Sequence, residues 1–203
     1  MDDRVVIALF RHGVTEENKR KAYLGWNDSP LCFETKANLI SKRYQRYYSS
    51  DLKRCVHTAK RLFPHASPNL DKELREMNFG KWEGKTYEDL KENRLYRNWL
   101  TDPFAHCPPE GESFQEFNKR IDSGWSKIAV EILTSNLESV AVITHGGVIR
   151  YLLSRFAPNP KDFWAWQVTH DQGYELIFER ESLRRGERCT LLLEVPLTAN
   201  EPG

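Results

Sequence analysis

The stretch Val5-Val6-Ile7-Ala8-Leu9-Phe10-Arg11-His12-Gly13 decides the fold of this chain. Residues 5–10 are all apolar and partly β-branched, a composition typical of a strand that is buried on both faces. The apolar run ends abruptly at an arginine, a histidine and a glycine. Because ligands of open α/β sheets bind beyond the carboxyl ends of the strands, the pattern predicts that His12 lies at a ligand site.

A second stretch repeats this pattern at Val140-Ala141-Val142-Ile143-Thr144-His145-Gly146-Gly147. An apolar strand again leads into a histidine that is followed by glycine, and glycine lets the backbone approach a ligand closely. A single histidine at a strand end is more often structural than catalytic. Two histidines at equivalent strand ends favour a shared site, and we expect His12 and His145 to face the same ligand.

The rest of the chain alternates between strand and helix patterns. We expect strands at residues 44–48, 70–74, 174–178 and 190–195. Helices are expected over 52–63, from Thr86 to Trp99, over 148–156, and from the Ser113–Glu116 capping box to Ile132. The order predicts an α/β fold whose mostly parallel central sheet is flanked by helices, with an antiparallel edge. We expect a single domain over residues 1–203, with a helical cap excursion over about 76–136.

Composition excludes several classes of protein. Hydrophobic residues make up 39% of the chain and aromatic residues 12%, too many for a disordered protein. The 30 Lys and Arg nearly balance the 29 Asp and Glu, so no nucleic-acid partner is expected. The acidic start lacks the pattern of a signal peptide, and no apolar run could span a bilayer. A cytoplasmic location without membrane contact, and reduced cysteines, are therefore expected.

Arg54 has an unusual place in its helix. Ser50 or Asp51 is expected to cap the helix, which puts Arg54 in the first turn. A cation there opposes the helix dipole by roughly 0.3–1 kcal/mol. The position is favourable if Arg54 and the helix N-terminus together hold an anion. A solvated surface arginine is the alternative.

An electropositive cluster able to bind a phosphoryl group would be formed by Arg11, Arg54, His12 and His145. Phosphoryl transfer requires neutralisation of spread negative charge, which arginines can supply without a metal ion. A neutral imidazole nitrogen of His12 could attack phosphorus, and a carboxylic acid could protonate the leaving oxygen and then activate water. We expect no metal and no cofactor, because the histidines lack short metal-ligand spacing and the chain has no aspartate-rich cluster.

At these residues the chain resembles the histidine phosphatase superfamily, also called phosphoglycerate-mutase-like. Arg-His-Gly alone would be a weak signal, but the further motifs occur in the family's order and extend over most of the chain. The motifs are Arg11-His12-Gly13 with Thr15 and Asn18, then Gly25–Leu31, Ser49–Arg54, Leu74–Gly84, Glu110–Ser113 and Thr144–Gly147.

The resemblance implies roles for individual residues. His12 would accept the phosphoryl group, and Arg11, Arg54 and His145 would form the phosphate pocket. The acid–base role and the remaining substrate contacts rest on the same resemblance.

Glu76, rather than Glu83, would be the proton donor, although the spacing of the two glutamates cannot choose between them. Asn18 would add a hydrogen bond to the phosphate, with Thr15 close by. Gly146 is grouped with the substrate-binding residues because glycine permits close approach of a ligand.

The resemblance is to the phosphatase branch of the family, because Glu76-Met-Asn-Phe-Gly80 is similar to phosphatase members and the chain is short. The expected function is that of a histidine acid-type phosphatase that hydrolyses monoesters of small phosphorylated metabolites through a phosphohistidine. A phosphoglycerate-type mutase and a non-catalytic phosphate-ligand binding module are the alternatives. Val14 and the 171–174 segment depart from the family's pattern.

Overall fold

The computed structural model describes residues 3–32 and 40–197, and a six-stranded sheet is its central element. The elements follow the chain in this order: β1 (Arg4–Arg11), α1 (Glu16–Lys19), β2 (Arg46–Ser49), α2 (Lys53–Leu62), β3 (Asn69–Leu70), the 3₁₀ helices η1 (Lys72–Leu74) and η2 (Gly80–Trp82), α3 (Tyr87–Leu90), α4 (Arg94–Thr101), α5 (Phe114–Thr134), β4 (Ser139–Thr144), α6 (Gly146–Phe156), η3 (Phe163–Ala165), β5 (Gln172–Glu179), α7 (Arg180–Arg184) and β6 (Leu191–Pro196).

The strand order is β3-β2-β4-β1-β5-β6. β1, β4, β2 and β3 are mutually parallel, whereas β5 pairs antiparallel with β1 and β6 pairs antiparallel with β5. This arrangement confirms the predicted α/β fold with a mostly parallel sheet and an antiparallel edge. The polar segment that connects β5 to β6 in the terminal hairpin contains the short helix α7.

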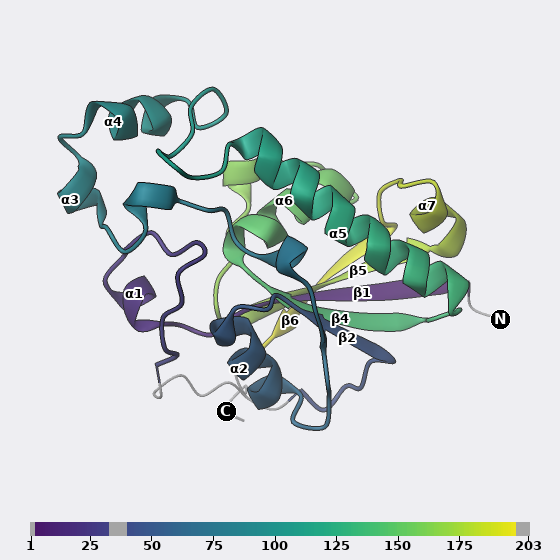
Figure 1. Cartoon of the computed structure of the whole chain (residues 1–203). Coiled ribbons are helices and arrows are strands. Elements are labelled where there is room, and N and C mark those ends of the chain that lie inside the picture. Colours follow the sequence, from purple (N-terminus) through teal and green to yellow (C-terminus); the bar gives the residue numbers. More distant parts are fainter. Residues whose placement is uncertain (1–2, 33–39, 198–203) are drawn as a thin grey trace, which may run out of the picture.

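Alternate residues of β1 pack on opposite faces of the sheet, as the pleat of a strand requires. Val5, Ile7 and Leu9 join the core beneath α5 and α6, while Ala8 and Phe10 join the core beneath α2. Figure 1 shows the same two layers, with α5 and α6 on one side of the sheet and α2 on the other. The apolar run that opened the sequence is therefore buried on both faces.

The segment between η2 and α4 has a small core of its own. Trp82, Leu90, Tyr96 and Trp99 form a cluster separate from the two sheet cores. In Figure 1, α3 and α4 lie away from the sheet, towards the side at which β1 ends. α5 instead packs on the sheet, so only the first part of the 76–136 excursion stands over the strand ends.

Two local predictions are wrong. The strand expected over residues 70–74 is limited to Asn69–Leu70, because Asp71 accepts a hydrogen bond from the Glu73 amide and starts η1. The helix expected from Thr86 to Trp99 is divided into α3 and α4. Asn93 ends it by accepting hydrogen bonds from the amides of Leu95 and Tyr96, which begins a new helix.

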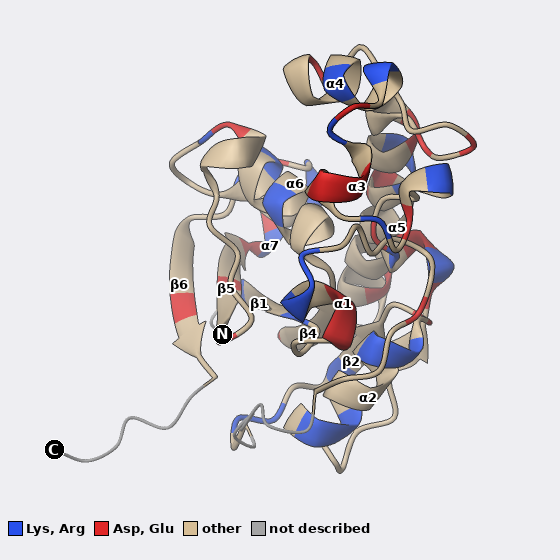
Figure 2. Cartoon of the chain, turned by 90° about the vertical axis from the view of Figure 1, so that its left-hand side faces the viewer, with Lys and Arg blue, Asp and Glu red and all other residues tan. Residues whose placement is uncertain are grey.

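Figure 2 shows acidic residues on α3 and basic residues on α2 and α4, while α1 carries both. The first turns of α1 and α3 are acidic, and the last turn of α2 carries Lys60 and Arg61. Each placement complements the dipole of its helix. Within the described residues, none of the helices has the length and apolar character required to cross a bilayer.

Candidate active site

The carboxyl ends of the parallel strands β1, β4 and β2 lie side by side at one edge of the sheet. Arg11 at the end of β1 pairs in register with Thr144 at the end of β4. The His12 amide then donates to the Thr144 carbonyl (2.9 Å), and the Ser50 amide beyond β2 donates to the Ile143 carbonyl (2.9 Å). The backbone hydrogen bonds of the sheet therefore continue beyond the strand ends. They fix the backbone of His12 and Ser50, which lie at the site.

His12 is held with one ring nitrogen available for chemistry. Its Nδ1 lies 2.8 Å from the Gly13 carbonyl oxygen, which can only accept, so Nδ1 carries the proton and Nε2 keeps a lone pair. The side chain is buried. Burial, and then the charges of Arg54 and Arg11, hold the pKa of His12 well below its usual range. The ring is therefore a neutral, oriented base at neutral pH.

His145 faces His12, with 5.2 Å between the two ring centroids. Its Nε2 lies 2.9 Å from the Ser50 hydroxyl and 3.4 Å from the Cys55 thiol. Burial, and then the charge of Arg54, hold the pKa of His145 well below its usual range. The sequence did not indicate Ser50 or Cys55 as partners of this ring.

Arg54 is fully buried, and its guanidinium donates hydrogen bonds to the loop that follows α1. Its Nη1 donates to the Asn27 carbonyl (2.7 Å) and its Nη2 to the Gly25 carbonyl (2.5 Å). Arg11 Nη1 donates to the Val168 carbonyl (2.6 Å), and burial lowers the pKa of Arg11 to about 10. The Nε–H groups of Arg11 and Arg54 are buried without a hydrogen-bond partner among the described residues.

An unpartnered buried N–H costs about 1–3 kcal/mol, and more when it belongs to a charged group. Two such groups, one at the end of β1 and one in the first turn of α2, lie beside two neutral histidines. They indicate that the site accommodates an anion with several acceptor oxygens.

The cap expected at Ser50 or Asp51 is wrong. α2 begins after Leu52 without a side-chain cap from its own segment, because Ser50 contacts His145 and Asp51 forms an ion pair with Arg75. Asp28, from the loop that follows α1, accepts hydrogen bonds from the amides of Lys53 (2.9 Å) and Arg54 (3.4 Å) instead. Its carboxylate also lies 3.4 Å from Arg54 Nη1, which accounts for a cation in the first turn of a helix.

Glu76 reaches the N-terminus of α6. Its Oε2 accepts the Gly147 amide (2.9 Å) and its Oε1 accepts the Met77 amide (3.1 Å). A Cβ atom at position 147 would lie 2.3 Å from Oε1, so glycine is needed there for the carboxylate to fit. The sequence had singled out Gly146, whose own hydrogen-only side chain instead makes room for the Arg11 guanidinium.

Glu83 has different partners. Its carboxylate accepts the amides of Trp26 (2.6 Å), Asn27 (2.5 Å) and Phe79 (3.2 Å). These bonds tie the 25–28 loop to residues 74–84, here called the acidic loop. Of the two glutamates in that loop, Glu83 joins the loops together and Glu76 lines the cavity described below.

Thr15 and Asn18 form a capping box at α1. The Thr15 hydroxyl accepts the Asn18 amide, and the Asn18 side-chain oxygen accepts the Thr15 amide, both at 3.2 Å. The capping arrangement fixes the Asn18 side chain and uses its oxygen, so any donation to an anion would come from its NH₂ group.

His170 is a site residue that the sequence analysis missed. Its Nδ1 donates to the His12 carbonyl (2.7 Å), and its ring centroid lies 5.4 Å from that of His12. Burial and the charge of Arg11 lower the pKa of His170 to about 4. The signal was available, because an antiparallel strand beside β1 must begin at the edge where β1 ends, and His170 precedes β5.

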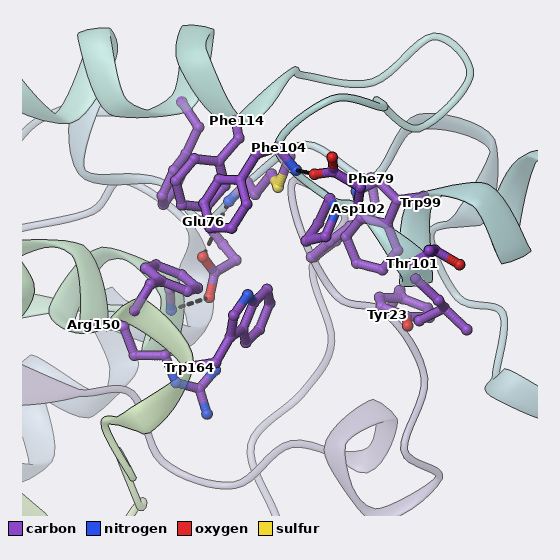
Figure 3. A pocket seen from close by; sticks show the side chains of 16 residues that line it. Tyr23, Glu76, Phe79, Trp99, Thr101, Asp102, Phe104, Phe114, Arg150 and Trp164 are labelled. Carbon is purple, nitrogen blue, oxygen red and sulfur yellow. Dashed lines mark hydrogen bonds between the residues drawn. The ribbon is translucent and has the colours of Figure 1, made fainter. Parts of the chain in front are cut away.

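A cavity of about 620 Å³ extends from Glu76 and Gly147 towards the cap. Figure 3 shows the Glu76 carboxylate among aromatic side chains, with Arg150 close by. Among the residues that the structure describes, no group of three or more His, Cys, Asp or Glu side chains is arranged to hold a metal ion.

Comparison with known proteins supports a single family. The chain is 31% identical over 157 residues to a putative phosphoserine phosphatase 2 of Hydrogenobacter thermophilus, covering 71% of this chain and 75% of that protein. It is 30% identical over 172 residues to an adenosylcobalamin/alpha-ribazole phosphatase of Salmonella typhimurium, covering 79% and 84%. The alpha-ribazole phosphatase of Shigella flexneri has the same fold, with a TM-score of 0.80 over 98% of both chains at 23% identity.

The family model of the histidine phosphatase superfamily (branch 1) matches residues 7–185. This range includes both strand-end histidines, Arg54, the acidic loop and the cap. The match agrees with the resemblance seen in the motifs, and the chain belongs to the histidine phosphatase superfamily, branch 1.

Proposed function

We propose that this chain hydrolyses phosphate monoesters of small organic molecules without a metal ion, through a phosphohistidine on His12. The observation that carries the proposal is the pair of buried, unpartnered Nε–H groups of Arg11 and Arg54 beside the neutral ring of His12. A phosphoryl group would supply the acceptors that these donors lack and would lie next to the His12 lone pair.

In the first step, the Nε2 lone pair of His12 forms a bond to phosphorus while the bond to the leaving oxygen breaks. Glu76 gives its proton to that oxygen. Arg11, Arg54 and His145 stabilise the phosphoryl oxygens, with Asn18 donating from its NH₂ group and Thr15 holding Asn18 in place. Gly146 permits Arg11 to lie against the start of α6.

In the second step, the Glu76 carboxylate takes a proton from water. The resulting hydroxide forms a bond to phosphorus, the phosphorus–nitrogen bond breaks, and phosphate leaves with His12 restored. The two partners of Glu76, the amides of Gly147 and Met77, keep its carboxylate in place through both steps.

Hydrolysis is favoured over mutase chemistry because the two relatives described above, both at least 30% identical to this chain, are named as phosphatases. Those names differ in the molecule that carries the phosphate, so neither substrate is transferred to this chain. A mutase would return the phosphoryl group to the organic product, whereas a phosphatase gives it to water.

The test uses the full chain in EDTA with a panel of phosphorylated acids, sugars and alkyl or aryl alcohols. We expect phosphate release by the wild type and its loss in His12→Ala, with acid-labile phosphate trapped on the wild type in quenched samples. Equal release by His12→Ala would refute the proposal. Formation of an isomeric phosphate faster than free phosphate would support the mutase alternative, and binding without turnover would support the binding module.

A further inference from the structure

The cavity beyond Glu76 has one wall made of a continuous run of aromatic rings. Phe104 of the cap contacts Phe114 of α5, with ring centroids 4.5 Å apart and the rings edge to face. Phe114 contacts Phe163 at 5.0 Å, and Phe163 contacts Trp164 at 4.7 Å, again edge to face. The wall therefore links the cap, α5 and η3.

A second wall is formed by Tyr23, Phe79 and Trp99. Tyr23 lies 5.0 Å from Phe79, and Phe79 lies 6.2 Å from Trp99, between ring centroids. Figure 3 shows these rings on one side of the cavity and Arg150 on the other, with the Glu76 carboxylate reaching in between. A group attached to the leaving oxygen at Glu76 would enter the space between the two aromatic walls.

The volume and the exposure of the walls indicate the size of that group. The cavity of about 620 Å³ lies in the range of sites for multi-ring ligands. It has room for roughly twenty water-sized groups, far more than a serine or glycerate moiety would fill. Trp164 and Phe104 remain 54% and 58% exposed, and a bulky ligand would remove this apolar surface from water.

Few of the residues that line the cavity are charged. Arg150 is the cation among the lining residues, and its guanidinium lies over the Trp164 ring, 5.9 Å from the ring centroid. Its Nε donates to the Trp166 carbonyl (3.0 Å). The carboxylate of Asp102 is bound by the amides of Phe104 and Ala105.

We propose that the preferred substrates are phosphate monoesters whose alcohol carries a fused aromatic ring system, held between the two walls. Arg150 supplies hydrogen-bond donors for an acceptor atom on that ring system. The inference rests on the proposed function, because it takes the leaving oxygen to lie at Glu76. Aromatic walls favour an aromatic occupant over an aliphatic one of similar area, since edge-to-face and offset-stacked pairs add to simple burial.

The experiment compares alkyl phosphates whose alcohols are similarly poor leaving groups: ethyl phosphate, decahydro-1-naphthylmethyl phosphate, 1-naphthylmethyl phosphate and phosphoserine. We expect kcat/KM for naphthylmethyl phosphate to exceed that for ethyl phosphate by on the order of 100-fold. It should exceed that for the saturated decahydronaphthylmethyl ester, which has a similar area, by about 5-fold. Equal values, or preference for phosphoserine, would overturn this inference and leave the proposed function standing. Absence of phosphate release from every ester would instead refute the proposed function.

Variants locate the preference in the walls. Trp164→Ala and Phe104→Ala should each lower the ratio of kcat/KM for naphthylmethyl over ethyl phosphate by about 10-fold. Because the readout is a ratio, partial loss of folded protein does not alter it. Tyr87→Ala is the matched control, since Tyr87 is as exposed as Trp164 (54%) but does not line the cavity. An unchanged ratio in both wall variants, or an equal drop in the control, would contradict the inference.

Discussion

Glu76 and Glu83 are the same residue type in one loop, and their partners distinguish them. Glu76 accepts two amides at the edge of the cavity, whereas Glu83 accepts three amides that join two loops. Glu76→Gln should therefore lower kcat/KM for an alkyl phosphate by about 10²–10⁴-fold, the range for loss of a general acid. The drop in kcat/KM should be much smaller for 4-nitrophenyl phosphate, whose leaving group departs without a proton, because kcat/KM reports the steps up to departure of the leaving group and not the later attack by water.

Glu83→Gln is the matched control for this prediction. It should lower the free energy of unfolding by about 1–3 kcal/mol, because a neutral amide replaces a charged acceptor. The dependence of kcat/KM on the leaving group should remain that of the wild type. Rates with both ester types, and urea unfolding of each variant, provide the measurements. If the larger loss for the alkyl phosphate appeared only in Glu83→Gln, then Glu83 would be the proton donor and Glu76 would not.

At the scale of single elements, α2 depends on a residue outside it. Asp28 accepts the amides of Lys53 and Arg54 and pairs with the buried Arg54 side chain. Asp28→Ala should lower the free energy of unfolding by about 1–3 kcal/mol, through loss of the cap and of one partner of a buried charge.

Urea unfolding measures the effect of Asp28→Ala, and Asp28→Asn is the informative control. The asparagine retains a side-chain oxygen for the helix amides, so its unfolding free energy should lie between those of Asp28→Ala and the wild type. An alanine variant as stable as the wild type would show that α2 needs no cap from the 25–28 loop.

The sequence predicted the long, regular elements well and the short ones poorly. Residues 5–10 and 140–144 correspond to β1 and β4, and the Ser113 capping box starts α5 as expected, because apolar periodicity records burial directly. The strand over 70–74 failed because the Asp71 cap outweighed an apolar pattern of only a few residues. Propensity decides little over so short a segment.

Across the whole molecule, some contacts between site residues could be predicted from the sequence and others could not. His12 and His145 could be paired from sequence because parallel strands share a carboxyl edge, a rule of topology. His170 could have been placed at the same edge from the antiparallel strand that follows it, although no motif singled it out. Asp28 could not, since it reaches Arg54 through a loop whose course no local pattern encodes. The sequence likewise could not choose between Glu76 and Glu83, which are the same residue type in one loop, whereas the hydrogen-bond partners of the two carboxylates differ.

The three neutral histidines of the site make the free energy of unfolding of the whole molecule depend on pH. The pKa values of His12 and His145 lie well below the ordinary 6.5, and that of His170 is lowered to about 4. The unfolded chain binds protons at these histidines near pH 6.5 while the native chain does not. The free energy of unfolding should therefore be fully retained above about pH 6.5 and fall as the pH decreases below it.

The decrease should reach up to about 1.4 kcal/mol per pH unit for each histidine that is protonated only in the unfolded state. Urea unfolding at pH 7.5, 6.5 and 5.5 without phosphate measures this slope, above the range in which carboxylates titrate. His170→Asn should reduce the slope, with the exposed His106→Asn as the control for loss of a histidine. A wild-type stability that stays constant or rises between pH 6.5 and 5.5 would mean that the native histidines accept protons. In that case His12 would not be held neutral for attack on phosphorus.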